Sequence, residues 1–259
     1  MSILQSFSLD GKVALVTGAS RGIGEAMALA FAEAGAQVAL VARTEGELER
    51  VREAAQAHGR RALAIPGDLA DIGTCSDVVQ RTVSAFGRID VLANVAGTIR
   101  RVPILDATPA DYDAVLQLNL RSVYFLYREV GRVMVEQRQG KIINIASMTS
   151  YRGYADLSPY SLSKTAIVSL TKNLAVEWAP YNIQANAIAP GWIETALTAS
   201  MAPSRRQWVI DHTPQGRFGS PRDVALLALY LASPASDFMT GAVLPLDGGF
   251  LAGHAWPPL

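Results

Sequence analysis

The chain of 259 residues is long enough for one large α/β domain and short for two full domains with a linker. Half of its residues are apolar, and 23 basic side chains balance 23 acidic ones, so its field would attract neither nucleic acid nor an anionic membrane surface. The most apolar stretches, such as Ala225 to Ala232, are far shorter than the ~20 residues that a membrane span needs. We therefore expect neither nucleic acid nor membrane as a partner.

Cysteine and histidine usage narrows the class further. The single cysteine, Cys75, cannot form an internal disulfide, and we expect it to fill space near a helix start. The N-terminus has no basic start, apolar core and small-residue cleavage site, so we predict a cytoplasmic protein. His58, His212 and His254 are scattered and form no ligand spacing, so no metal site is expected.

Short apolar, β-branched runs alternate with longer segments of helical period along the chain. Strands buried on both faces and separated by helices favour a parallel sheet that is covered on both sides. We predict one doubly wound, Rossmann-like α/β/α domain over residues 1–259, without repeats or linkers. The expected strands are Lys12–Thr17, Gln37–Ala42, Ala62–Ile65, Val91–Ala93, Lys141–Ala146, Gln184–Ala189 and Ala242–Pro245. The expected helices are Gly22–Ala34, Glu45–His58, Ile72–Phe86, Asp111–Gln137, Pro159–Trp178 and Pro221–Ala232.

A glycine-rich turn, T-G-A-S-R-G-I-G at residues 17–24, joins the first expected strand to the first helix. Glycines here permit a tight turn and let backbone N–H groups approach a pyrophosphate, which the positive end of the helix also attracts. The spacing differs from the commoner G-x-G-x-x-G, and its place after the first strand favours nucleotide binding. Asp68–Leu69 follows the third expected strand and Asn94–Gly97 follows the fourth, at the sheet edge where such folds bind ligands.

Tyr160 and Lys164 stand at i and i+4 at the start of a long expected helix, so they share one face. A nearby ammonium stabilises a phenolate and moves its pKa towards the operating range of an acid/base catalyst. Ser147 ends the strand Lys141–Ala146 on the same sheet edge. Asn119 lies inside an expected helix among apolar residues, where a buried amide needs partners.

In these features the chain resembles the short-chain dehydrogenase/reductase family, in its short single-domain branch. The resemblance runs from Asp10 to about Gly249, and one departure from the family pattern is Val95, where a second Asn is usual. Its motifs, in order, are TGASRGIG at Thr17, DL at Asp68, NVAG at Asn94, Asn119, Ser147, YSLSK at Tyr160 and PGWIET at Pro190.

The resemblance implies a role for each matching position. Tyr160 would exchange a proton with the substrate oxygen, and Ser147 would hold and polarise that oxygen. Lys164 would hydrogen-bond the nicotinamide ribose and lower the Tyr160 pKa, and Asn119 would anchor a water that links Lys164 to solvent. The implied cofactor-binding residues are Gly18, Ser20, Arg21, Gly22, Ile23, Gly24, Arg43, Asp68, Leu69, Asn94, Ala96, Gly97, Tyr160, Lys164, Pro190, Gly191, Ile193 and Thr195.

The resemblance also implies a homotetramer. The helices Asp111–Gln137 and Pro159–Trp178 would pair across one two-fold axis, and the last helix and strand across another. The C-terminal tail, residues 253–259, carries an aromatic residue and two prolines, and either packs on a neighbouring subunit or is a frayed end.

The end of the second expected strand bears on which nicotinamide is used. Ala42 stands where an acid would select NAD(H) through the ribose 2′-OH, and Arg43 follows it. A guanidinium can pair bidentately with a 2′-phosphate, and Arg21 adds a second positive charge. We therefore predict a preference for NADP(H), with NAD(H) as the alternative cofactor.

The segment from about 191 to 217 is loop-rich and placed as a substrate lid. The substrate-facing candidates are Arg100, Arg152, Trp192 and Trp208. The runs GTIRR and KIINIASM resemble sugar-acid dehydrogenases of the family, such as gluconate 5-dehydrogenase and 2-deoxygluconate 3-dehydrogenase. The leading hypothesis is an oxidoreductase for a secondary alcohol/ketone pair, such as a keto sugar acid. Two others stay open: a 3-oxoacyl-thioester reductase, and a catalytically inactive nucleotide-sensing protein of the same fold.

Overall fold

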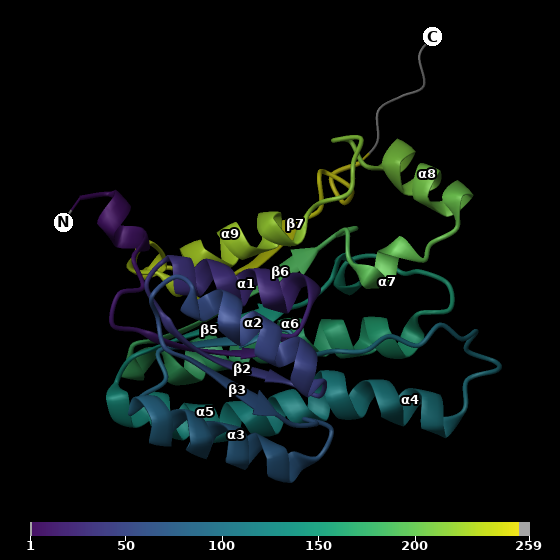
Figure 1. The fold of residues 1–259 in the computed structure, drawn as a ribbon. Coiled ribbons are helices and arrows are strands. Elements are labelled where there is room, and N and C mark those ends of the chain that lie inside the picture. The colour runs from purple at the N-terminus through teal and green to yellow at the C-terminus, as the bar shows by residue number, and fades with distance from the viewer. Residues whose placement is uncertain (1, 254–259) are drawn as a thin grey trace.

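The computed structural model describes residues 2–253 (Figure 1). The expectation for the C-terminal tail concerns residues 253–259, of which 254–259 lie outside the described part of the chain.

Seven strands in the described residues form one parallel sheet in the order β3-β2-β1-β4-β5-β6-β7. From β1 the chain adds β2 and β3 on one side of the sheet and then β4 to β7 on the other side. This change of direction leaves a crevice between β1 and β4. The predicted doubly wound α/β fold is confirmed. The strands are β1 Val13–Thr17, β2 Gln37–Ala42, β3 Ala62–Pro66, β4 Val91–Asn94, β5 Gly140–Ile145, β6 Ile183–Pro190 and β7 Val243–Leu246.

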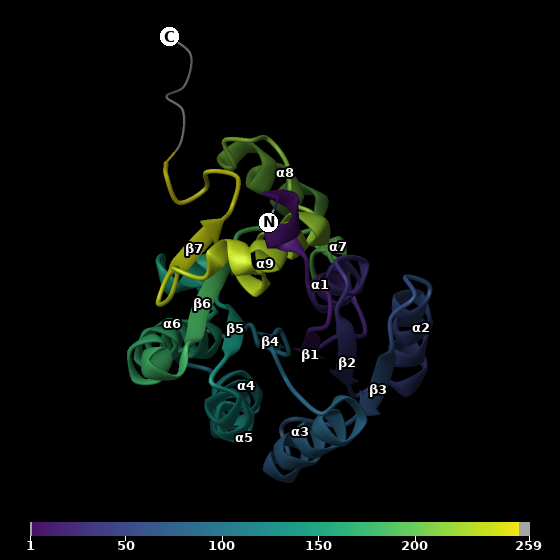
Figure 2. The ribbon, with the colours of Figure 1, turned by 90° about the vertical axis from the view of Figure 1, so that its left-hand side faces the viewer.

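Helices cover both faces of the sheet, which gives three layers (Figure 2). One layer holds α1, Gly22–Glu33, between α2, Glu45–Gln56, and α9, Pro221–Ala232. The other layer holds α3, Ile72–Phe86, α5, Ser122–Gln137, and α6, Ser158–Trp178, with α4, Pro109–Leu116, continuing the line of α5.

Burial on both faces explains the apolar character of the strands. All five residues of β1 are buried, and so are all six of β5. Each fully buried aliphatic side chain contributes roughly 1.5–3 kcal/mol of transfer free energy, so these central strands hold the sheet rigid beneath its carboxyl edge. In the described part of the chain, no helix is long and apolar enough to cross a membrane.

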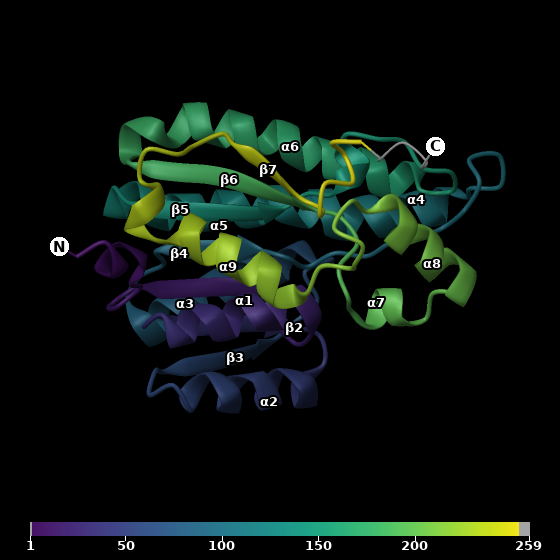
Figure 3. The ribbon, with the colours of Figure 1, turned by 90° about the horizontal axis from the view of Figure 1, so that it is seen from above.

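Two segments differ from the expected elements. The single helix expected over Asp111–Gln137 is α4 and α5 joined by a π-helical turn, Gln117–Arg121. The loop-rich segment after Pro190 contains two short helices, α7, Ala196–Ala199, and α8, Pro203–His212. Both lie with the start of α4 at one end of the molecule (Figure 3). Helix α8 was missed because Pro203 and its mixed polar residues conceal a short helix whose one buried residue is Val209.

Candidate active site

The turn between β1 and α1 is shaped by close backbone approaches. Gly18 has φ +64°, and a Cβ there would come within 2.9 Å of the Ala96 backbone, on the loop that follows β4. A Cβ on Gly24 would overlap the Gly18 carbonyl oxygen. The loop can therefore close only with glycine at these two positions, and the resulting bend aims the first N–H groups of α1 outward from the sheet edge.

A cavity of about 460 Å³ lies against this turn, at the carboxyl ends of β1, β2, β3 and β4. The glycine cradle, an apolar floor and a helix N-terminus together fit a dinucleotide. Of the predicted cofactor residues, those that line the cavity are Gly18, Ser20, Arg21, Gly22, Ile23, Gly24, Arg43, Asp68, Leu69, Ala96, Gly97 and Thr195.

The other predicted cofactor residues lie deeper or beside this cavity. Gly191 directly follows Pro190, the end of β6, and a Cβ on it would come within 2.8 Å of the Asp247 backbone. Ile193 is buried and bridges to Gly219, which fixes the start of the segment that carries Thr195. Asn94 accepts a hydrogen bond from the Thr17 hydroxyl, at 3.3 Å.

At one end of the cavity the side chain of Arg43 is 71% exposed, and its Nη1 lies 4.0 Å from an Asp68 carboxylate oxygen. Such an exposed pair contributes little free energy, so the guanidinium can exchange this partner for a stronger one. Ala42, Thr44 and Arg21 also line this end. The residues therefore suit a ribose that carries a phosphate.

Ser147 and Tyr160 come together from different elements. Ser147 follows β5 and is buried, and its hydroxyl accepts the Thr149 N–H at 3.1 Å. Burial raises the pKa of Tyr160, whereas a hydrogen bond with the Ser147 side chain and the charge of Arg101 lower it. A phenol next to a serine hydroxyl can hold a carbonyl or alcohol oxygen between the two groups.

Lys164 lies one helical turn beyond Tyr160 and is 6% exposed. Its Nζ donates a hydrogen bond to the Ile145 carbonyl at 2.7 Å and lies 5.8 Å from the centre of the Tyr160 ring. Burial lowers the pKa of Lys164 to about 8. The sequence predicted that Lys164 lowers the Tyr160 pKa, but burial of the phenol is the dominant influence in this structure.

Asn119 occupies the middle of the π-helical turn and is buried. Its amide Nδ2 donates to the Thr98 carbonyl at 2.9 Å and to the Ser163 hydroxyl at 3.1 Å, and its Oδ1 accepts the Thr98 N–H at 2.7 Å. A cavity of about 10 Å³, room for about one water, separates Asn119 from Lys164. Asn94 also lines it, and within the described residues its Nδ2 has no hydrogen-bond partner.

Three of the four predicted substrate residues make contacts with aromatic rings. Trp192 meets Tyr154 edge-on at 6.4 Å, and Trp208 of α8 stacks on His212 at 4.2 Å. Arg152 lies over the Phe250 ring at 5.6 Å, the ring that also meets the Trp208 edge.

Arg100 is exposed, and its charge adds to the Thr108 hydrogen bonds that chiefly lower the pKa of Asp111 at the start of α4. The neighbouring Arg101, which the sequence did not single out, acts on Tyr160 instead. Two adjacent arginines in a loop look alike in sequence, and only the backbone path separates them.

The nucleotide cavity against the glycine turn, together with the serine–tyrosine pair, defines the class of the protein, a dinucleotide-dependent oxidoreductase. The family model described as enoyl-(acyl carrier protein) reductase matches residues 18–251. The chain belongs to the short-chain dehydrogenase/reductase family.

Three similar proteins illustrate the comparison. A 2-dehydro-3-deoxy-D-gluconate 5-dehydrogenase of Dickeya dadantii is 41% identical, over 96% of this chain and 99% of its own. A 3-oxoacyl-[acyl-carrier-protein] reductase of Thermotoga maritima is 37% identical, over 94% and 99%. The structure of a gluconate 5-dehydrogenase from Burkholderia cenocepacia, in complex with NADP and tartrate, is 36% identical with a TM-score of 0.93, over 97% and 100%.

Proposed function

We propose that the protein interconverts a secondary alcohol and a ketone on a sugar acid, with NADP(H) as the hydride carrier. The observation that carries the proposal is the dinucleotide-sized cavity against the glycine turn, with Ser147 and Tyr160 close enough for the serine side chain to lower the tyrosine pKa. Two of the similar proteins described above are named as dehydrogenases of sugar acids, which supports this substrate class.

The chain's own residues supply orientation and proton transfer. The nicotinamide, when bound, supplies or accepts the hydride at C4. Tyr160 donates its proton to the carbonyl oxygen during reduction and takes it from the alcohol during oxidation, while the Ser147 hydroxyl holds that oxygen. Lys164 holds the ribose, and the π-helical turn at Asn119 places a water-sized cavity next to the Lys164 ammonium, through which the proton is replenished.

NADP(H) is the proposed cofactor because of the end of β2. No acid stands at Ala42, and Arg43 is exposed with a weak partner, at 4.0 Å. The Burkholderia relative is described in complex with NADP, which supports the same preference.

A 3-oxoacyl-thioester reductase is the second candidate, because the Thermotoga relative carries that name at 37% identity. A turnover screen separates the candidates. Purified protein is assayed with both cofactors on keto sugar acids, polyols and a 3-oxoacyl thioester. Highest kcat/KM for a sugar acid supports the proposal, highest kcat/KM for the thioester supports the second candidate, and cofactor binding without any turnover supports the inactive protein.

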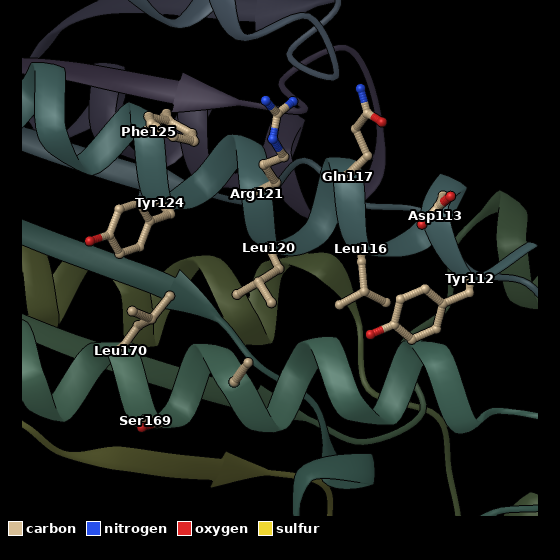
Figure 4. Close-up of a pocket in the computed structure, with 11 residues that line it drawn as sticks. Tyr112, Asp113, Leu116, Gln117, Leu120, Arg121, Tyr124, Phe125, Ser169 and Leu170 are labelled. Carbon is tan, nitrogen blue, oxygen red and sulfur yellow. The ribbon is translucent and has the colours of Figure 1, made fainter. Parts of the chain in front are cut away.

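We also propose a homotetramer. Helices α4, α5 and α6 form a groove of about 650 Å³ on the outer face of their layer (Figure 4). Tyr112 and Tyr124 line it, with 47% and 56% of their surface exposed, and Leu120 and Leu170 point toward each other across it. An apolar groove between two long parallel helices suits the same helices of a second copy.

A further inference from the structure

Arg50 joins two helices, α1 and α2, that both line the cofactor cavity. It lies on α2, and its guanidinium donates two hydrogen bonds to Glu25 in the first turn of α1, from Nη1 to Oε1 at 2.7 Å and from Nη2 to Oε2 at 3.0 Å. Nη2 also donates to the carbonyl of Ser20 at 3.3 Å. One side chain therefore contacts α1 and the glycine turn that precedes it.

Ser20 lies in the wall of the cofactor cavity. It is buried, and it lines the cavity together with Arg21, which directly precedes α1. The turn is also attached to β2, because the N–H of Ala19 donates to the Val41 carbonyl at 3.1 Å. The backbone of the turn is thus held at two consecutive residues, by the end of β2 at Ala19 and by Arg50 at Ser20.

Glu25 carries a charge that by itself would oppose the cofactor. The N-terminus of α1 lines the cavity, where its partial positive charge and its first N–H groups favour a pyrophosphate. Glu25 is the acidic residue of that same first turn, and an unpaired carboxylate there would repel the phosphates. The Arg50 guanidinium pairs with this carboxylate at 2.7 Å, so the two charges largely cancel and the pair as a whole acts through its geometry.

Stability alone does not account for this pair. The side chains of Arg50 and Glu25 are 57% and 23% exposed, and ion pairs at such exposure contribute little to the free energy of unfolding. A bidentate contact is nevertheless geometrically specific, because both nitrogens of the guanidinium fork must meet both carboxylate oxygens. The contact therefore fixes α2 and the glycine turn relative to α1.

We propose that Arg50 and Glu25 are positioning residues for the dinucleotide, which hold the Ser20 backbone in the shape that accepts the cofactor. This rests on the proposed function only for the identity of the cofactor, NADP(H). Because a glycine turn of this kind meets the pyrophosphate that NADPH and NADH share, the pair serves both cofactors alike. In this it differs from Arg43, whose proposed partner is the 2′-phosphate of NADPH.

Fluorescence titration of NADPH and NADH, without substrate, tests the proposal. For Arg50→Ala and for Glu25→Ala we expect the Kd of both cofactors to rise about three- to ten-fold, with kcat at saturating cofactor and Tm nearly unchanged. Arg50→Lys keeps the charge but lacks the fork, so it should not restore the wild-type Kd. Arg52→Ala removes one positive charge from the same helix, where Arg52 pairs with Glu49, and should leave both Kd values unchanged.

The sign of the Glu25→Ala effect separates positioning from charge. If the pair acted through its charges, removal of the carboxylate would tighten the anionic cofactors and removal of Arg50 would weaken them. Positioning predicts that each substitution weakens binding, and that the double variant binds no more weakly than the weaker single variant, because both substitutions remove the same contact. Titrations at about 0.5 M salt screen the remaining charge effect.

Unchanged Kd values in Arg50→Ala, a lower Kd in Glu25→Ala, or a loss confined to NADPH would overturn the proposal. Because the titrations contain no substrate, they test the pair independently of which alcohol the protein oxidises.

Discussion

Tyr160 and Lys164 are one helical turn apart, yet their environments push their proton equilibria in opposite directions. Burial raises the pKa of the phenol and lowers the pKa of the ammonium to about 8, so burial shifts both groups toward their neutral forms. In the proposed mechanism, proton transfer by Tyr160 at neutral pH therefore depends on nearby charges that lower its pKa, such as Arg101.

Tyr160→Phe removes the proton donor and retains the ring. We expect turnover to fall by roughly 10²–10⁴-fold, the range typical of a lost general acid or base, while the Kd for NADPH changes by less than about two-fold. Steady-state kinetics and fluorescence titration of NADPH measure the two quantities. Near-normal turnover in this variant would show that another group transfers the proton.

The pH dependence of cofactor binding tests Lys164. In the structure its pKa is about 8, and the ribose and phosphates of a bound cofactor favour the charged ammonium, so binding raises this pKa. Above about pH 8 the complex then holds more protons than the free enzyme, and affinity for NADPH decreases as the pH rises. Titrations from pH 6.5 to 9.5 measure this slope. The slope should disappear in Lys164→Met, and a slope of equal size in that variant would assign it elsewhere.

Arg43→Ala tests the choice between the two nicotinamides. A charge-assisted hydrogen bond contributes roughly 1.5–3 kcal/mol, so kcat/KM for NADPH should fall about ten- to a hundred-fold, while NADH use barely changes. Added salt should narrow the preference of the wild type, because Arg43 is exposed. Equal losses for both cofactors would mean that Arg43 supports the loop and does not contact the phosphate.

Individual residues were predictable where a motif fixes the backbone around them. Ser147 and Tyr160 could be paired because one ends a central strand and the other begins a helix at the same sheet edge. The influence of Arg101 on Tyr160 could not be predicted, because Arg100 and Arg101 look alike in sequence.

At the scale of elements, the glycine turn and α2 offer a direct comparison. Gly24→Ala places a methyl group against the Gly18 carbonyl oxygen, so the turn must open and affinity for NADPH should fall at least about ten-fold. The Cβ of Gly46→Ala in α2 meets no described atom within 4 Å. This variant should be more stable by about 0.5–1 kcal/mol, with unchanged affinity for NADPH. Thermal unfolding and NADPH titration of both variants measure this. Unchanged NADPH binding by Gly24→Ala would refute the steric account of the cradle.

The sheet and its helices could be predicted from the sequence, because the apolar pattern of every central strand matches its burial in the structure. The π-helical turn could not, since Gln117–Arg121 continues the helical pattern of α4 without a glycine or proline to mark it. Hydrogen bonds of Asn119 with Thr98 and Ser163, which are remote in sequence, stabilise this turn. Motif resemblance identified Asn119, and only the fold shows how it is positioned.

At the scale of the whole molecule, the groove between α4, α5 and α6 leaves apolar surface uncovered in a single copy. Tyr124 and Tyr112 are about half exposed, and the neighbouring Leu120 and Leu170 are partly buried within the groove. Burying such a face in a two-fold contact gains hydrophobic free energy at roughly 25 cal/mol per Å², whereas a charge introduced there must be desolvated twice, once in each copy.

Tyr124→Glu should therefore split the tetramer into dimers and leave the fold of each subunit intact, because the side chain is exposed in the monomer. Sedimentation velocity at micromolar concentration measures the mass, and circular dichroism reports the fold. Ala57→Glu, at the exposed end of α2, adds the same charge far from the groove and should leave the tetramer unchanged. Asn119 lies in the turn that adjoins α5, and Lys164 lies on α6, so separation of the subunits should loosen the site. We therefore expect kcat to fall in the same variant in which the sedimenting mass falls. A wild-type enzyme that sediments as a fully active monomer would contradict both the assembly and this coupling.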